Sequence, residues 1–311
     1  MTSTALSAPA APHKPTVALA LGSGGAKGLA QIGVIEELET QGFQIVAIAG
    51  SSMGALIGGI HAMGKLDVYR DWVCALARFD VLRLVDWTFS GGGLIKGERI
   101  IETLRTLIGD TQIETLPLAF TAVATDLDRE REVWLTRGSL FDAIRASIAI
   151  PTIFRPHTIN GRRLVDGALL NPVPVTPLIR ETADYVIAVS MDGPAEVPLP
   201  AAPAPTSAHE ENSYRQRIGE FIGHLIPHGE SEARAPGTFE LLAQAMDLMQ
   251  SNLSRLRLAV YEPDLLIQLP RNIASVYEFY RARELIERGR EQARQALAGW
   301  SKAGSPTRTD E

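Results

Sequence analysis

Two hydrophobic periodicities alternate along the chain. Short apolar runs indicate buried strands, whereas apolar residues spaced three and four positions apart indicate the helices that cover them. The predicted strands are 17–21, 44–49, 118–124, 131–135, 163–165, 185–190 and 264–268. The predicted helices lie near 26–40, 52–63, 66–78, 97–108, 139–147, 173–181, 239–258 and 276–298. This alternation predicts a three-layer α/β fold, with a mostly parallel central sheet and helices on both faces.

The second predicted strand runs directly into Gly50-x-Ser52-x-Gly54 and then into a helix of small and apolar residues. A serine at a sharp strand-to-helix turn needs neighbours without bulk, and such a turn holds the hydroxyl clear of the sheet. The pattern therefore predicts a nucleophile elbow with Ser52 at its tip. The alternative is an ordinary turn, because Gly and Ser are common in turns.

A glycine-rich loop, GSGGAKG, starts at Gly22 between the first strand and the first helix. Such a loop presents backbone N–H groups at a helix N-terminus, where a phosphate or a developing oxyanion is stabilised. A dinucleotide fingerprint needs glycine where Lys27 stands, and a P-loop needs Ser or Thr where Gly28 stands. We therefore expect an oxyanion hole. The alternative is that the glycines serve only close packing of the helix. Its apolar residues are expected to face the core, and Glu36, Glu37 and Glu39 are expected to be solvated.

A short apolar strand ends at Asp166, which precedes Gly167 and a turn. This position predicts a carboxylate at the mouth of the sheet. A serine nucleophile needs a base, and a buried carboxylate with a raised pKa serves if it reaches the hydroxyl. The alternative is that Asp-Gly is simply a turn.

Together the three motifs resemble those of the patatin-like phospholipases. The family has a glycine-rich oxyanion loop, a G-x-S-x-G elbow and a D-G-[AG] motif in this order, which correspond here to residues 24–28, 50–54 and 166–168. Residues 145–151, ahead of the aspartate, are also similar, and the resemblance extends over about 16–299. One departure is Ser23, which stands where the family's loop often has its first glycine.

The resemblance implies a serine lipid acyl hydrolase, which is a carboxylic ester hydrolase that forms an acyl-enzyme and needs no cofactor. Ser52 would attack the ester carbonyl, and Asp166 would take its proton and later activate water. The N–H groups of Gly24 and Gly25 would hold the oxyanion. Lys27 would face an anionic headgroup or, in the interpretation we favour, be a solvated residue at the helix start. The implied substrates are phospholipids, lysophospholipids or other long-chain acyl esters.

Three other functions stay open. An acyltransferase would use the same site, and a non-catalytic interaction protein would use the fold alone. A Ser-His-Asp hydrolase would need a histidine after the aspartate, and His209, His224 and His228 follow it in or beside a Pro/Ala-rich region. His61, nine positions beyond Ser52 on one predicted helix, is expected on the opposite side of that helix.

Composition narrows the class of protein further. The net charge of −6 over 311 residues argues against nucleic-acid binding and against attraction to anionic membranes by bulk charge. The single cysteine, Cys74, is interpreted as core packing and excludes an intramolecular disulfide. No residues have the spacing of metal ligands. Because no apolar run reaches the ~18 residues that span a bilayer, we expect a cytoplasmic protein whose contact with lipid is peripheral, at the inner face of the membrane.

The predicted domain organisation is simple. Residues 1–15 are an Ala/Pro/Ser/Thr-rich tail without the apolar core of a signal peptide, 16–299 form the catalytic domain, and 300–311 are a second tail. Pro and Ala dominate the start of 193–237, which is interpreted as a mobile insertion. Within it, the apolar face of 213–228 is that of a lid-like helix or of a helix packed on the domain.

Overall fold

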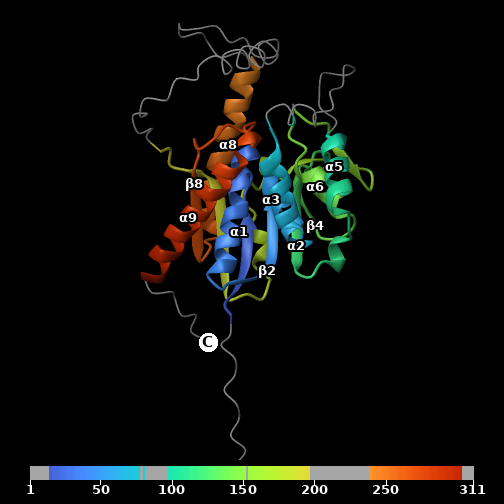
Figure 1. The fold of residues 1–311 in the computed structure, drawn as a ribbon. Coiled ribbons are helices and arrows are strands. Elements are labelled where there is room, and N and C mark those ends of the chain that lie inside the picture. Colours follow the sequence, from blue (N-terminus) through green and yellow to red (C-terminus); the bar gives the residue numbers. More distant parts are fainter. Residues whose placement is uncertain (1–13, 78–79, 81–96, 152, 197–237, 303–311) are drawn as a thin grey trace, which may run out of the picture.

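A computed structural model describes residues 14–77, 80, 97–151, 153–196 and 238–302, and shows an eight-stranded sheet packed between helices (Figure 1). The strands are β1 Thr16–Leu21, β2 Gln44–Ser51, β3 Ala119–Asp126, β4 Arg131–Leu135, β5 His157–Ile159, β6 Arg162–Asp166, β7 Tyr185–Gly193 and β8 Leu265–Pro270. The helices are α1 Ala30–Thr40, α2 Met53–Ala62, α3 Leu66–Ala75, α5 Glu98–Ile108, α6 Leu140–Ser147, α8 Thr238–Val260 and α9 Ala282–Lys302. Short 3-10 turns are η1 Gly25–Leu29, η2 Ile113–Thr115, η3 Gly167–Leu169, η4 Thr176–Leu178 and η5 Phe279–Arg281.

The sheet is mostly parallel. Strands β3, β2, β1, β7 and β8 run side by side in the same direction. At the β3 end, β4 and β6 pair antiparallel with β3, and β5 pairs antiparallel with β6. This confirms the predicted fold class. The difference lies in β5, which the sequence pattern does not predict because it is three residues long and half-exposed.

The two faces of the sheet are covered unequally. Large side chains of β1, such as Leu19 and Leu21, point into the main core beneath α1, α2 and α9. Figure 1 shows these helices and α3 in front of the sheet. The alternate positions of β1 are alanines, Ala18 and Ala20, and pack with the η4 segment and Leu258 of α8. Because the side chains on this face of the sheet are small, the η4 segment and α8 can approach the strands closely.

Three predicted helices differ from the structure. The helix expected over 26–40 begins as the 3-10 turn η1, and α1 starts only at Ala30. The helix expected over 173–181 is only the 3-10 turn η4, because Pro172, Pro174 and Pro177 lack backbone N–H donors and fix φ. The helix expected over 276–298 begins at Ala282, after η5, and continues to Lys302. The predicted tails and the predicted insertion fall largely on 1–13, 197–237 and 303–311, outside the described residues.

Helices α1 and α9 cross at very short range. A Cβ on Gly33 would overlap Ile286 O, and a Cβ on Gly289 would overlap Ala30 O, so only glycine fits at either position. The same contact corrects one prediction. Glu37 is buried, not solvated, because α9 covers it and Arg294 pairs with its carboxylate at 3.0 Å.

Candidate active site

Strand register brings the ends of β2 and β6 together. Strand β4 occupies one edge of β3 over residues 122–126, so β2 and β6 must share the other edge. There β2 ends at Ser51 beside Val123, and the antiparallel β6 ends at Asp166 beside Ala124. The carboxyl ends of the two strands therefore meet head to head.

Ser52 lies at the turn between β2 and α2 in a strained backbone conformation. Its φ of 55° and ψ of −121° are unfavourable for a residue with a Cβ, and such strain persists only where the surroundings enforce it. The two flanking glycines explain how the turn closes. A Cβ on Gly50 would overlap Gly54 O, and a Cβ on Gly54 would overlap Leu21 O. The turn has the geometry of a nucleophile elbow.

Ser147 holds the backbone of this turn. The Ser52 N–H donates to Ser147 Oγ at 2.9 Å, and Ser147 Oγ donates to Val123 O at 2.6 Å. Ser147 is fully buried at the end of α6. Sequence reasoning misses this residue; the only signal for it is its place in residues 145–151, the segment that resembles the family ahead of the aspartate.

The Ser52 hydroxyl donates to Asp166 Oδ2 at 2.6 Å, and the Ala168 N–H donates to Asp166 Oδ1 at 2.8 Å. Asp166 is 2% exposed. Burial raises the pKa of Asp166 to about 7, against the opposing effect of the hydrogen bonds from Ser52 and Ala168. A carboxyl with this pKa takes up and releases a proton near neutral pH, as a general base must. Gly167 follows with no room for a side chain, since a Cβ there would overlap Val123 O.

The glycine-rich loop lies against the elbow. A Cβ on Gly54 would be 2.8 Å from Gly22 O, and a Cβ on Gly28 would overlap Met53. The loop is anchored at its start, where the Gly22 N–H donates to Val189 O at 3.0 Å and the Ser23 N–H donates to Pro172 O at 2.9 Å.

The next two residues of the glycine-rich loop have backbone N–H groups that are not used in hydrogen bonds. Among the described residues, the N–H groups of Gly24 and Gly25 have no acceptor, and neither has the N–H of Met53 at the start of α2. Gly25 has a φ of +54°, which favours glycine. On α1, buried Gln31 donates from Nε2 to Gly22 O at 2.6 Å and fixes the loop from behind. Unpaired backbone N–H groups are the kind of donor that stabilises an oxyanion.

Lys27 is not solvated, contrary to the interpretation that the sequence favours. It is 8% exposed, and its Nζ donates to Arg271 O at 3.3 Å, because the chain after β8 folds over the start of η1. Burial raises the pKa of Asp192, an effect that the Lys27 charge opposes. Lys27 therefore helps to hold the glycine-rich loop in position against the chain that follows β8.

The described histidines lie near other acidic groups. His61 Nε2 is 3.6 Å from Glu39, and His157 Nε2 is 3.6 Å from Asp142. The acceptor of the Ser52 hydroxyl is the aspartate. The histidines that a triad would need, His209, His224 and His228, lie outside the described residues.

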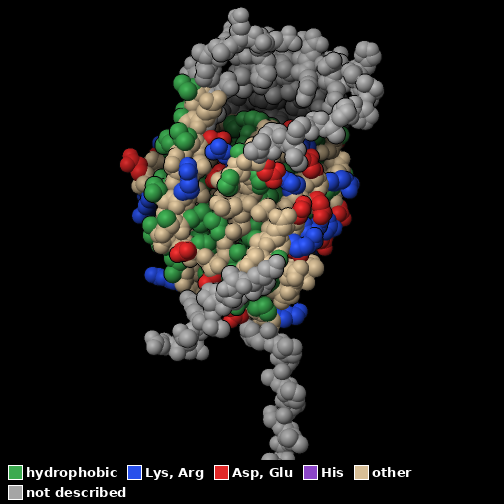
Figure 2. All heavy atoms as spheres, turned by 90° about the vertical axis from the view of Figure 1, so that its left-hand side faces the viewer, with side chains coloured by type: hydrophobic (Ala, Val, Ile, Leu, Met, Phe, Trp, Pro, Cys, Tyr) green, Lys and Arg blue, Asp and Glu red, His purple; other side chains and the backbone are tan. Residues whose placement is uncertain are grey.

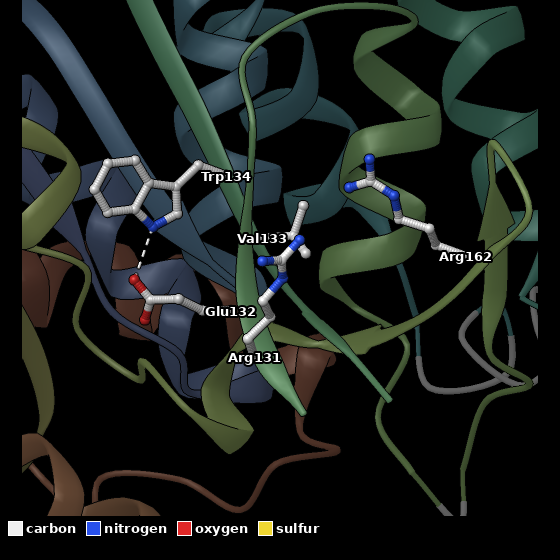
Figure 3. A pocket seen from close by; sticks show the side chains of 5 residues that line it. All are labelled: Arg131, Glu132, Val133, Trp134 and Arg162. Atoms are coloured by element: carbon white, nitrogen blue, oxygen red, sulfur yellow. Dashed lines mark hydrogen bonds between the residues drawn. The ribbon is translucent and has the colours of Figure 1, made fainter. Parts of the chain in front are cut away.

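An open pocket of 410 Å³ lies elsewhere, on β4 and the start of β6. Its lining residues are Arg131, Glu132, Val133, Trp134 and Arg162 (Figure 3). The Trp134 indole N–H donates to Glu132 at 2.8 Å. Neither Ser52 nor Asp166 lines this pocket. Within the described ranges, no group of three or more His, Cys, Asp or Glu residues is placed to hold a metal ion.

Comparison with known protein families matches residues 19–179 to the patatin-like phospholipases. The chain belongs to the patatin-like phospholipase family. Among curated proteins, an uncharacterized NTE family protein of Mycobacterium tuberculosis (strain ATCC 25618 / H37Rv) is 39% identical over 329 residues, which cover 91% of each chain. The lysophospholipase NTE1 of Yarrowia lipolytica is 30% identical over 183 residues, which cover 56% of this chain and 12% of that protein.

Among solved structures, VipD from Legionella pneumophila matches this patatin-like chain with a TM-score of 0.44 and 15% identity, over 93% of this chain and 67% of VipD. None of the helices in the described residues is long and apolar enough to cross a membrane.

Proposed function

We propose that this patatin-like protein is a serine lipid acyl hydrolase that works with a Ser52–Asp166 dyad. The observation that carries the proposal is the buried hydrogen bond of 2.6 Å between the Ser52 hydroxyl and a carboxyl whose pKa is about 7. A hydroxyl held at hydrogen-bond distance from a base of suitable pKa is the requirement for an activated nucleophile.

In the acylation step, Ser52 Oγ attacks the ester carbonyl carbon while its proton passes to Asp166 Oδ2. The tetrahedral intermediate collapses, the bond to the leaving alkoxide breaks, and Asp166 returns the proton to that oxygen. Water then attacks the acyl-enzyme, with Asp166 taking a proton from the water. As the second intermediate collapses, Asp166 returns this proton to Ser52 Oγ, the carboxylic acid is released and the Ser52 hydroxyl is restored.

The N–H groups of Gly24 and Gly25 are proposed to stabilise the negative oxygen of both intermediates. The support for this role is that both are unpaired among the described residues and that the loop touches the elbow. The Met53 N–H, also unpaired among the described residues, is proposed as a third donor, since the residue after the nucleophile commonly contributes. One such donor is typically worth about 3–4 kcal/mol in the barrier.

The proposed substrates are phospholipids, lysophospholipids or other long-chain acyl esters. Family membership and the likeness to a lysophospholipase support this class. We propose a cytoplasmic location with peripheral contact at the inner face of the membrane, where such esters are found.

The test is release of fatty acid from lysophosphatidylcholine micelles by the full chain and by Ser52→Ala, with methanol offered as a second acceptor. The proposal predicts fatty acid from the wild type and at least a thousandfold less from Ser52→Ala. Methyl ester in excess of fatty acid would indicate an acyltransferase. If the wild type releases neither fatty acid nor methyl ester, the result would favour a non-catalytic interaction protein.

A further inference from the structure

The outer face of α8 is apolar over most of its length. Six large hydrophobic side chains on it are 45–72% exposed. They are Leu241, Leu242, Leu248, Met249, Leu256 and Val260, and we call them the apolar face of α8. At 100° per residue they fall within an arc of about 120°. Isolated exposed leucines are ordinary, but a contiguous patch of this size on one helix marks an interaction site.

Charge is absent from this arc. Between Leu241 and Val260, the charged residues Asp247, Arg255 and Arg257 project outside it, and the main polar residue within it is Asn252. The Asn252 side chain is already satisfied by its own helix. Its Nδ2 donates to Leu248 O at 2.8 Å, and its Oδ1 accepts from Arg255 at 3.3 Å. Moving this face out of water therefore leaves only the second N–H of the Asn252 amide without a partner.

The opposite side of α8 is fixed to the protein. Ser254 is 1% exposed, Leu258 packs on the thin face of the sheet, and Arg257 pairs with Glu132 of β4 at 2.9 Å. Helix α8 also packs against η3, which starts directly after Asp166. Figure 1 shows the beginning of α8 projecting above the sheet. Figure 2, seen from the left-hand side of Figure 1, shows hydrophobic side chains interspersed with charged ones along its left-hand edge.

The chemistry of this face fits lipid better than protein. Protein interfaces are specified by hydrogen bonds at a polar rim, and within the arc only the Asn252 amide has a donor left to make one. A bilayer requires only an apolar face with polar flanks, and Arg255 supplies a cation at its border. Two aromatic residues of the kind enriched at membrane–water interfaces, Trp134 and Tyr261, are 45% and 38% exposed near the end of α8.

We infer that α8 docks this protein on a phospholipid bilayer, with its apolar face in the acyl region and the helix beside the Ser52–Asp166 pair. This inference rests on the proposed function for the lipid substrate. It concerns a different part of the molecule, because the apolar face of α8 takes no part in the proposed reaction at Ser52 and Asp166. The docked helix would hold the site next to its esters and away from bulk water.

The experiment is cosedimentation of the full chain with phosphatidylcholine vesicles. The double variant Leu248→Asp/Met249→Asp places two charges on the apolar face of α8. The matched control is Val68→Asp/Leu107→Asp, which changes two exposed apolar residues on α3 and α5. The inference predicts that wild type and control bind equally. The α8 variant should bind about a hundredfold more weakly, or roughly tenfold for each side chain kept out of the lipid.

Hydrolysis of a short soluble ester separates this inference from the proposed function. The α8 variant should keep wild-type activity on that ester, and Ser52→Ala, inert on it, should still bind vesicles. Equal vesicle binding by the α8 variant and the control would overturn the inference. So would a wild-type dimer in size-exclusion chromatography with light scattering that the α8 variant dissociates, because the face would then serve a second copy.

Discussion

Asp166 is a carboxyl group that the fold buries almost completely, whereas the proposed mechanism requires it to ionise. Burial raises its pKa to about 7, so a large part of the population is protonated at neutral pH. The base of the proposed mechanism is the ionised form. Activity and stability should therefore respond to pH in opposite directions at this one residue.

For activity, kcat/KM on a soluble ester should fall about tenfold for each pH unit below about 7 and be flat above it, because only ionised Asp166 accepts the Ser52 proton. The measurement is a pH profile between 5 and 9. A profile without an inflection near 7 would show that Asp166 is not the titrating base.

For stability, the native state holds the Asp166 proton more tightly than the unfolded chain, since its folded pKa is raised from 3.8 to about 7. The contribution of Asp166 to the free energy of unfolding is fully present below about pH 4 and is lost as the pH rises through about 7. Asp166→Asn keeps both hydrogen-bond partners without a charge. Its free energy of unfolding should exceed the wild-type value by about 1–3 kcal/mol at pH 8, with little difference at pH 4. The same difference in urea unfolding at both pH values would contradict this account.

Ser147 gives a second prediction at the residue scale. Ser147→Ala removes the acceptor of the Ser52 N–H and leaves it buried and unpaired, so kcat should fall at least about tenfold with little change in KM. The control is Ser254→Ala, which removes another buried serine whose hydroxyl has no partner in the described structure. Equal kcat values for the two variants would show that Ser147 contributes to packing and not to the position of Ser52.

At the scale of elements, the crossing of α1 and α9 depends on glycine. Gly289→Ala places a Cβ into Ala30 O and should lower the free energy of unfolding by about 2 kcal/mol or more. Gly299, in the same helix, has no atom within 4 Å of the position that a Cβ would take, so Gly299→Ala should raise it by about 0.5–1 kcal/mol. Thermal unfolding of both variants checks this; two changes of the same sign would mean that the close crossing is not maintained in solution.

Elements were predictable where one periodicity dominates, as in β1, β2 and α2. The pattern failed where covalent geometry overrides it, as in the proline-rich segment before η4, and where an element is very short, as in β5. Burial of polar residues was not predictable at Glu37 and Lys27, because their cover comes from Arg294 and Arg271, more than 240 positions away. The candidate pair Ser52 and Asp166 was accessible from local motifs, whereas the support from Ser147 depends on the contact of α6 with β3.

At the scale of the molecule, the motifs occupy the first part of the chain but the sheet is completed by the last part. The family match ends at residue 179, while β7, β8 and α9 follow it. Helix α9 covers α1 with Leu285 and Ile286, both buried. The described core therefore includes elements that lie beyond the family match.

A chain ending at residue 196 should consequently fail to fold, because it exposes the core face of α1 and one edge of β7. The expected result is aggregation or loss of a cooperative thermal transition, while a chain ending at residue 302 keeps the wild-type transition. A monomeric, cooperatively folded product from residues 1–196 would show that β8 and α9 are dispensable.

The most direct test of the central claim is the rate of p-nitrophenyl butyrate hydrolysis by wild type, Ser52→Ala, Asp166→Asn and the triple variant His209→Ala/His224→Ala/His228→Ala. The Ser–Asp account predicts a loss of at least a thousandfold in the first two variants and wild-type kcat/KM in the third. Loss of activity in the histidine variant with its fold intact would contradict the account and assign the protein a histidine-dependent triad.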